Sequence, residues 1–314
     1  MTTRRKKSTK KTGPGLFSTF GIKSKDLQTK DDLLDHRFSV ATKTFTGVIL
    51  RSTATNRKGV STGDVGALYK SKNTSIGVKF DTQSNITMII ALKKTVPSAN
   101  ITASFKLHDL KSSKIATTLT LTKIIPSTKV TASFQLPDFR TGKFVVEYLH
   151  HHATLASTIV LNQAPTIDVS ATIGTSVFAM GALAAYETSS SKFTNFIVGI
   201  NVNVPNATAS IILGDKGDMI RGTYMHHFDV SKRTAAAFEI TRRLSTNKTN
   251  FLIGGSYVFD GRTVVKGKLN SWGKLGVVLQ HEIIPKSRVS FSSELNIKAL
   301  HKTPKFGLAL VLKP

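Results

Sequence analysis

Two groups of residues have the types that metal or phosphate chemistry needs. One is His150-His151-His152, and the other runs from Gly267 to Gly273-Lys274. Consecutive strand residues point to opposite faces, so the histidines are not expected to converge on one metal ion, and we interpret them as a cluster at a strand end. The glycine–lysine run has five residues between its glycines where a P-loop has four, and Leu275 replaces the Ser or Thr that would hold Mg²⁺. With no other catalytic motif, the sequence predicts no enzyme, no metal site and no cofactor.

The remaining chemistry is that of positive charge. Lys and Arg number 44 against 18 Asp and Glu, which gives a formal net charge of +26. A field of this sign attracts anions, whether nucleic acid, acidic lipid or small metabolites. One set of basic residues shares a pattern, because each stands opposite the large apolar residues of an alternating segment. The set is Lys79, Lys106, Arg221, Arg243, Lys266, Lys268 and Arg288. Its placement depends on strand register, which a bulge would reverse.

The elements that carry these residues are short alternating segments. In the last of them, Phe306, Leu308, Leu310 and Leu312 fall on one face of an extended strand, and small or charged residues fall on the other. From about Phe38 onward such segments are joined by short turns, which is typical of an antiparallel meander. Their length of about nine or ten residues is long for a sandwich and suits a tilted membrane strand.

The two faces of these segments favour a membrane protein. One face is too polar for a packed core, and no later segment offers a helix that could cover a sheet. No run approaches the roughly 18 apolar residues of a membrane helix. The sequence therefore predicts an all-β fold for residues 36–314, a transmembrane antiparallel β-barrel whose apolar face meets lipid. The basic set would then point into the lumen and favour anions.

The N-terminal region differs from the rest. Residues 1–14 are predicted to be a disordered basic arm, because the first twelve residues are rich in Lys and Arg and contain no acid. Gly13-Pro14-Gly15 then breaks the chain. Residues 15–35 are predicted to form a helix with Leu16, Phe20 and Leu27 on one face.

An internal repeat lies in the middle of the chain. The stretch from Val96-Pro97-Ser98 to Lys114 returns 29 residues later, from Ile125-Pro126-Ser127 to Lys143. A period of this length corresponds to two strands and two turns. We therefore interpret the unit as a duplicated hairpin in a barrel wall, because two copies do not make a solenoid.

Several further stretches carry a family resemblance. They are Gly13-Pro14-Gly15-Leu16-Phe17-Ser18, Leu136-Pro137-Asp138, Thr141-Gly142-Lys143, Tyr148-Leu149-His150, Asp215-Lys216-Gly217-Asp218, Gln280-His281-Glu282, Pro285-Lys286-Ser287 and Lys305-Phe306-Gly307-Leu308-Ala309-Leu310. In this collinear order, over Gly13–Pro314, the chain resembles the plant-type mitochondrial voltage-dependent anion channel (porin) family. Its last strand also resembles the mitochondrial β-signal for sorting, with Lys305, Gly307, Leu310 and Leu312 at the signal positions.

The resemblance implies a single-chain barrel with an odd number of strands and an N-terminal helix inside the pore. Leu16, Phe17 and Phe20 would rest on the wall, and Lys23 and Lys25 would face the lumen. It also implies a voltage-gated, anion-preferring diffusion pore of the mitochondrial outer membrane that passes metabolites such as ATP, ADP and phosphate. The implied partners are the lipid bilayer, permeating anions and nucleotides, and the outer-membrane import and assembly machinery. A homo-oligomer is a further possibility, and no nucleic acid is expected.

The chain departs from the family in its basic arm and its second hairpin copy. Its alternating segments number about 21, against the nineteen strands that the resemblance implies, and one added hairpin accounts for the difference. In the alternative, residues 98–123 loop out and the wall keeps nineteen strands.

The sequence argues against two other functions. A protein-import barrel of the same superfamily would show a larger N-terminal region and an acidic path, and neither is visible. A soluble basic β-protein that binds nucleic acid would present clustered aromatic and basic residues, whereas aromatic residues make up 8% of the chain without such a cluster.

Overall fold

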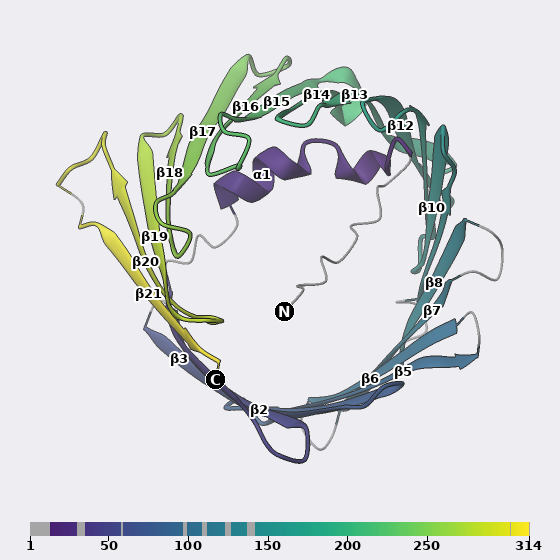
Figure 1. Cartoon of the computed structure of the whole chain (residues 1–314). Coiled ribbons are helices and arrows are strands. Elements are labelled where there is room, and N and C mark those ends of the chain that lie inside the picture. The colour runs from purple at the N-terminus through teal and green to yellow at the C-terminus, as the bar shows by residue number, and fades with distance from the viewer. Residues whose placement is uncertain are drawn as a thin grey trace.

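The chain folds into one closed sheet. The computed structural model describes residues 13–29, 35–57, 59–96, 99–108, 112–122, 127–136, 142–301 and 303–313. Within these ranges 21 strands form a single sheet in which each strand pairs with the next. A parallel pairing of the first strand with the last closes the sheet into the ring seen in Figure 1. The predicted all-β barrel with an odd number of strands is confirmed.

The strands follow one another in chain order. They are β1 (His36–Lys43), β2 (Val48–Arg57), β3 (Val60–Lys70), β4 (Thr74–Asp81), β5 (Asn85–Val96), β6 (Ala99–His108), β7 (Ser112–Thr122), β8 (Thr128–Leu136), β9 (Gly142–Leu149), β10 (Ala153–Leu161), β11 (Thr166–Gly174), β12 (Phe178–Glu187), β13 (Lys192–Asn203), β14 (Ala207–Gly214), β15 (Met219–His227), β16 (Thr234–Arg243), β17 (Lys248–Val258), β18 (Thr263–Asn270), β19 (Lys274–Ile284), β20 (Ser287–Asn296) and β21 (Lys305–Leu312).

The outer face of this wall is apolar. Large side chains such as Phe38, Leu155, Ile211 and Phe306 are exposed there, with exposed fractions between 47% and 64%. A continuous apolar surface of this kind is unfavourable in water and suits contact with lipid. Because side chains alternate along each strand, the residues between these positions point inward.

Both copies of the internal repeat lie in the wall. β6 pairs with β5 from Asn85↔His108 to Lys93↔Asn100, and with β7 from Ala99↔Leu121 to His108↔Ser112. β7 in turn pairs with β8. The interpretation of 21 strands is therefore confirmed, and the alternative in which residues 98–123 loop out of a nineteen-stranded wall is wrong.

The N-terminal segment lies inside the ring, along the wall (Figure 1). It consists of a 3₁₀ turn, η1 (Phe17–Thr19), and a helix, α1 (Ile22–Thr29). This differs from the predicted continuous helix over residues 15–35, because Gly21 adopts a left-handed φ of 71° and bends the chain between the two pieces. Residues 30–34, and the predicted basic arm at residues 1–12, fall outside the described ranges. Among the helices that are described, none is long and apolar enough to cross a membrane.

Candidate permeation path

Two aromatic rings hold the N-terminal segment on the wall. Phe17 and Phe20 are each 6% exposed, and their ring centroids lie 5.1 Å apart. They form one hydrophobic cluster with Ala179, Leu183, Ile197 and Ile212. Burial of each ring contributes about 1.5–3 kcal/mol to docking. The structure thus places both rings where the sequence analysis expects them, and it leaves Leu16 half-buried.

A second anchor of α1 is polar. The Gln28 side-chain amide donates hydrogen bonds to the carbonyl oxygens of Ala237 (3.3 Å) and Leu252 (3.0 Å). The Ser24 hydroxyl is buried and donates to the carbonyl oxygen of Tyr224 at 3.5 Å. Sequence analysis missed both residues because it sought an apolar face. The signal was present in the spacing, since Ser24 and Gln28 stand four residues apart on one face of α1.

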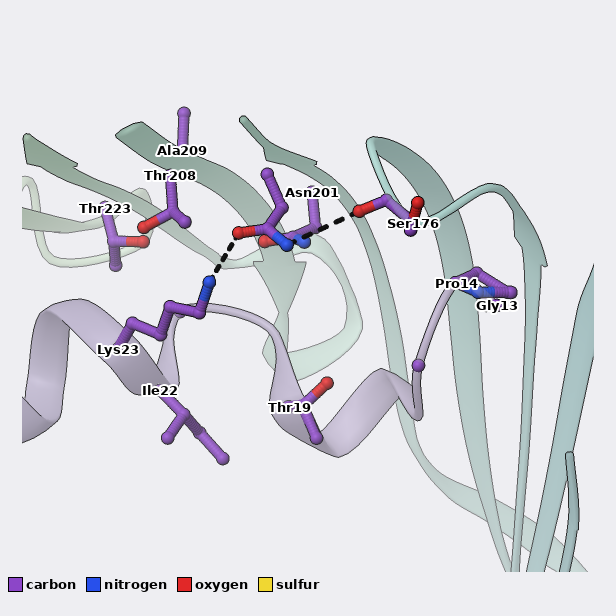
Figure 2. A pocket seen from close by; sticks show the side chains of 13 residues that line it. Gly13, Pro14, Thr19, Ile22, Lys23, Ser176, Asn201, Thr208, Ala209 and Thr223 are labelled. Carbon is purple, nitrogen blue, oxygen red and sulfur yellow. Dashed lines mark hydrogen bonds between the residues drawn. The ribbon is translucent and has the colours of Figure 1, made fainter. Parts of the chain in front are cut away.

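A cavity of about 350 Å³ lies between the start of the segment and the wall, and its lining includes Lys23, Asn203 and Thr208. Figure 2 shows Lys23 reaching across it to donate a hydrogen bond to the Asn203 side chain. Thr154 holds the start of the segment by donating to the carbonyl oxygen of Gly15 at 2.7 Å. The Lys23 and Lys25 side chains are both exposed. Lys23 therefore contacts the wall, whereas the resemblance implied that it faces the open lumen.

Six of the predicted basic residues lie on the inward face of the wall. Paired residues share a face, so the strand register identifies it. Lys268 pairs with Gly254, and Gly254 lies against Gln28 of α1, so Lys268 is on the inward face. Arg221 stands two residues before Thr223, which lies beneath Gly21, so Arg221 is on the same face. The six are Lys79, Arg221, Arg243, Lys266, Lys268 and Arg288. Lys106 pairs with Thr87 through its backbone, and the Lys106 side chain is not among those that the structure describes.

Lys79, Arg221 and Arg243 are among the residues of this set that form ion pairs across neighbouring elements. Lys79 lies 3.3 Å from Asp64, Arg221 lies 3.9 Å from Glu239, and Arg243 lies 3.2 Å from Asp215. These acids lie 15 to 28 residues away in the chain, so only the register brings them to the cations. Such half-exposed pairs add about 0–1 kcal/mol to stability. Their larger consequence is that each acid offsets part of the positive field in the lumen.

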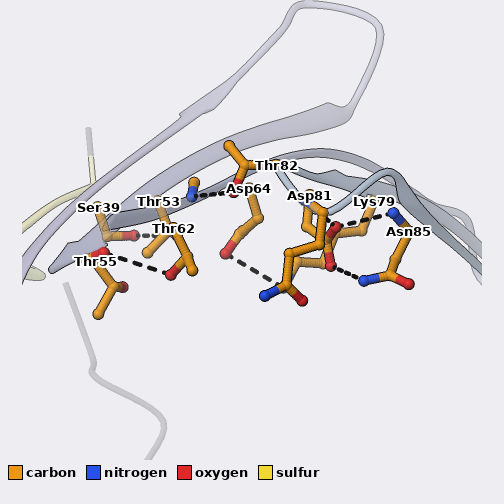
Figure 3. Close-up of polar contacts among 11 residues, drawn as sticks. Ser39, Thr53, Thr55, Thr62, Asp64, Lys79, Asp81, Thr82 and Asn85 are labelled. Carbon is orange, nitrogen blue, oxygen red and sulfur yellow. Dashed lines mark hydrogen bonds and ion pairs between the residues drawn. The ribbon is translucent and has the colours of Figure 1, made fainter. Parts of the chain in front are cut away.

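The wall opposite the helix is lined by paired polar groups, which Figure 3 shows on β1–β5. The hydroxyls of Ser39 and Thr53 lie 3.2 Å apart on adjacent strands. Asp81 accepts hydrogen bonds from the backbone N–H groups of Gln83 and Asn85 and from the Asn85 side chain. A lumen surface built in this way is hydrophilic and ordered at the same time.

Aspartates fix turns at both ends of the barrel. Asp218 accepts hydrogen bonds from the Ser245 hydroxyl (2.7 Å) and backbone N–H (2.6 Å), which ties two neighbouring turns together. These bonds, the side-chain one first, hold the pKa of Asp218 below its ordinary value. At the other end, the N–H groups of Arg262 and Thr263 lower the pKa of Asp260, together with the Thr263 hydroxyl. Both carboxylates favour their charged form because the turn donates to it.

His150-His151-His152 form the turn between β9 and β10 and do not lie within a strand. The alternation argument therefore does not apply to them. The ring of His150 lies 5.7 Å from that of His151 and 6.1 Å from that of His152, centroid to centroid. Among the described residues, no group of three His, Cys, Asp or Glu side chains has the arrangement of a metal site.

The predicted sorting-signal residues all lie on β21. Lys305 and Gly307 pair with Glu294 and Ser292 on the inward face, and Leu310 and Leu312 lie on the outward face. The strand therefore combines the last lipid-facing stripe with the seam that closes the barrel.

Known proteins resemble this chain in sequence over nearly its whole length. The family model for eukaryotic porins matches residues 13–116 and 109–307. Mitochondrial outer membrane protein porin 2 of Arabidopsis thaliana is 46% identical over 302 residues, covering 96% of this chain and 99% of that protein. Porin 5 of Oryza sativa subsp. japonica is 40% identical with the same coverage, and porin 4 of Arabidopsis thaliana is 37% identical over 301 residues, covering 96% and 98%. The chain therefore belongs to the eukaryotic porin family, and its closed barrel is a membrane pore of the mitochondrial outer-membrane type.

Proposed function

We propose that this pore lies in the mitochondrial outer membrane, prefers anions, passes metabolites such as ATP, ADP and phosphate, and responds to voltage. The observation that carries the proposal is an excess of basic over acidic residues on the inward face. A fixed positive potential in a narrow lumen raises the local concentration of anions and lowers that of cations. Nucleotides and phosphate are anions of the kind that a positive lumen would admit.

The excess holds beyond the predicted set. Further basic residues of the inward face are Arg37, Lys43, Arg51, Arg57, Lys70, Lys129, Lys143, Lys192, Lys248, Lys274 and Lys305. Acids of the same face are Asp64, Asp81, Glu147, Asp168, Glu187, Glu239, Glu282 and Glu294. Ion pairs cancel locally, and the remaining positive charge supports anion preference. The same excess argues against an import-type pore with an acidic path.

The way α1 is held supports a voltage response. Moving one elementary charge through the full membrane field changes its energy by about 2.3 kcal/mol per 100 mV. The two hydrogen bonds of Gln28 contribute about 0.5–1.5 kcal/mol each, which is of the same order. The buried rings of Phe17 and Phe20 hold more firmly. In this proposal α1, which carries Lys23 and Lys25, is released from the wall first and swings about Gly21 while η1 stays docked.

Reversal potential in a KCl gradient across a planar bilayer tests the anion preference. The full-length protein is expected to favour chloride. Changing Lys79, Arg221, Arg243 and Lys266 together to Glu is expected to weaken or reverse that preference, because four charges change sign and the net charge of the lumen falls by eight units. A matching set with Gln separates the loss of positive charge from new repulsion between carboxylates.

The matched control places the same charge change in turns, by converting Lys72, Lys216, Lys232 and Arg262 to Glu. Its effect on reversal potential is expected to be clearly smaller. Equal effects from the two sets, or no effect from the lumen set in protein that circular dichroism shows to be folded, would show that the inward residues do not set selectivity.

The assembly machinery of the outer membrane remains the proposed partner of β21, on the basis of its signal-like residues. Gly307 is buried and pairs with Ser292 at the inward face, so a larger residue there would perturb the closing strand itself. Leu310 and Leu312, in contrast, touch no inward group and report on recognition more cleanly. Import into isolated mitochondria with both leucines changed to Ser would test this role.

A further inference from the structure

The internal repeat extends to the hydrogen-bonding register. β5 pairs with β6 so that Ile86 is opposite Leu107 and Lys93 is opposite Asn100. β7 pairs with β8 so that Ile115 is opposite Leu136 and Thr122 is opposite Lys129. Adding 29 to every residue number from Ile86↔Leu107 to Lys93↔Asn100 gives the second ladder. The first ladder also contains Asn85↔His108 and, past a register shift, Val96↔Ala99, and the counterparts of these two pairs include residues outside the described ranges. The two ladders are therefore the same ladder displaced by one repeat, and not only two similar sequences.

This equivalence fixes what removal of one repeat would do. Without residues 96–124, Thr95 would be followed by Ile125-Pro126-Ser127 in place of the similar Val96-Pro97-Ser98. β8 would then meet β5 as β6 does now, with every pair in register. With such a junction, every side chain of β8 stays on its present face of the wall. A shift of the pairing by one residue would instead move all side chains of that strand to the opposite face.

The barrel would also still close. Removal of two strands leaves an odd number, so β1 and β21 keep their parallel pairing. The N-terminal segment contacts β11 and β12 through η1 and β15–β18 through α1, and none of these strands belongs to the repeat. Its docking is therefore independent of residues 96–124, whereas Gly13 lies against the carbonyl oxygen of His150 in the second copy.

The family comparison points to the same place. The eukaryotic porin model matches the chain in two pieces that overlap at residues 109–116. That overlap lies within the first copy of the repeat. The match to the family model is therefore divided inside the first copy of the repeat, which is where an added hairpin would divide it.

We propose that the β6–β7 hairpin is an added, in-register module of the wall, and that it widens the pore so that this channel passes larger solutes than the same barrel without it. Barrel diameter grows roughly in proportion to strand number, so going from 19 to 21 strands enlarges the cross-section by about a fifth. The inference rests on the proposed function only in that the lumen is open to solutes, and it does not depend on anion preference.

The experiment compares three proteins in liposomes and planar bilayers. They are the native chain, the chain without residues 96–124, and a chain in which residues 96–124 occur twice in succession. Neutral polyethylene glycols of rising mass give the size limit of each pore, because neutral polymers ignore the charge of the lumen. The expected order of size limits is deletion, native, insertion, with conductance of the deletion variant lower by about a fifth.

A deletion of residues 125–153 is the matched control, because it removes the same number of residues and strands. Here the ladders do not match: β10 would have to meet β7 as β8 does now, but Ile115 pairs with Leu136, whereas Phe144, one repeat later, pairs with Ile159 and not with Pro165. Loss of this copy would leave β10 six residues out of the register that β8 now has with β7, so a lower yield of folded channels is expected than from the deletion of residues 96–124.

Two results would overturn the proposal. If the variant without residues 96–124 formed no folded channels while the native chain did, the hairpin would not be a module. If all three proteins excluded the same polymers, the hairpin would not widen the pore. Loss of anion preference in any of them would count against the proposed function and leave this inference intact.

Discussion

Small inward residues determine how closely the N-terminal segment approaches the wall. A Cβ atom added at Gly181 would lie 2.5 Å from Cδ2 of Phe17 and 3.0 Å from the carbonyl oxygen of Ala171. Ala179, two residues earlier on the same face, is 2% exposed within the same cluster. The wall therefore has a shallow depression, the Phe17 seat, that holds one aromatic ring. The ring can approach the backbone there because Gly181 has no side chain.

Replacing Gly181 by Val is expected to displace the Phe17 ring and weaken docking by about 1–3 kcal/mol, as overpacking does elsewhere. The chain has no cysteine, so a spin label on Ser18→Cys reports motion of η1 without background. The label should become more mobile, and bilayer recordings should show more frequent closures.

Gly267→Val is the control, because an added Cβ at Gly267 meets nothing within 4 Å. It should leave both the label and the recordings unchanged. Equal label mobility in the two variants would mean that the ring is not held by this seat.

Individual residues of the path were predictable to the extent that alternation alone decides them. Lys79 and Lys266 lie inward because period-two alternation continues without a register shift in the ladders of their strands. Arg288 also lies inward, although its partner Glu282 borders the register shift at Glu282/Ile284, and the other shifts lie at Lys93/Val96 and Ala185/Tyr186. Their ionic partners were not predictable, since the pairing of Arg243 with Asp215 depends on how two hairpins stack. The three histidines were predicted at a strand end, and they lie in the turn that directly follows β9, since pattern alone leaves the last strand residue uncertain.

At the scale of elements, the N-terminal segment and the wall are nearly separate structures. The wall is joined by ladders between consecutive strands and by the β1–β21 seam, and none of these includes residues 13–29. The segment is held by one aromatic cluster and a few hydrogen bonds. Its contribution is to narrow the lumen, and the wall does not need it to close.

Deletion of residues 1–34 is therefore expected to leave the barrel folded and to change the pore. Single-channel conductance should rise because the lumen is less obstructed, and the voltage response should weaken because α1 is absent. Circular dichroism should show the β content retained. A truncated protein that failed to fold would place the segment in the structural core instead.

The elements themselves were predictable to different degrees. The strands follow from alternation, which is strong where one face meets lipid and the other water. The N-terminal helix was predicted as one piece because an amphipathic pattern spans Gly21, yet the left-handed φ of that residue divides it. Its docking face was predicted as apolar throughout, and the polar half, Ser24 and Gln28, becomes visible only when the backbone carbonyls of the wall are in place.

At the scale of the whole molecule, the direction of the closing strand records the number of strands. In an up-and-down meander each strand reverses the direction of the last, so an odd number makes the first and last strands parallel. The register Arg37↔Ala309 and Ser39↔Val311 is parallel, and all four residues lie on the inward face. An even wall would run β21 the other way, and the two pairs could not both be in contact.

Cysteine pairs at this seam therefore test the closure of the barrel. Two double variants, Arg37→Cys with Ala309→Cys and Ser39→Cys with Val311→Cys, should both be linked in membranes by a short cross-linker that carries two thiol-reactive groups. Both pairs are expected to link because the residue numbers of the two strands rise together along a parallel pairing. Val40→Cys with Val311→Cys is the control, because these residues lie on opposite faces and should link poorly. Linking is read as a mobility shift on a denaturing gel, and the linked Ser39–Val311 protein should still conduct. Linking of one inward pair without the other would contradict a parallel seam, and with it the odd number of strands on which the added hairpin depends.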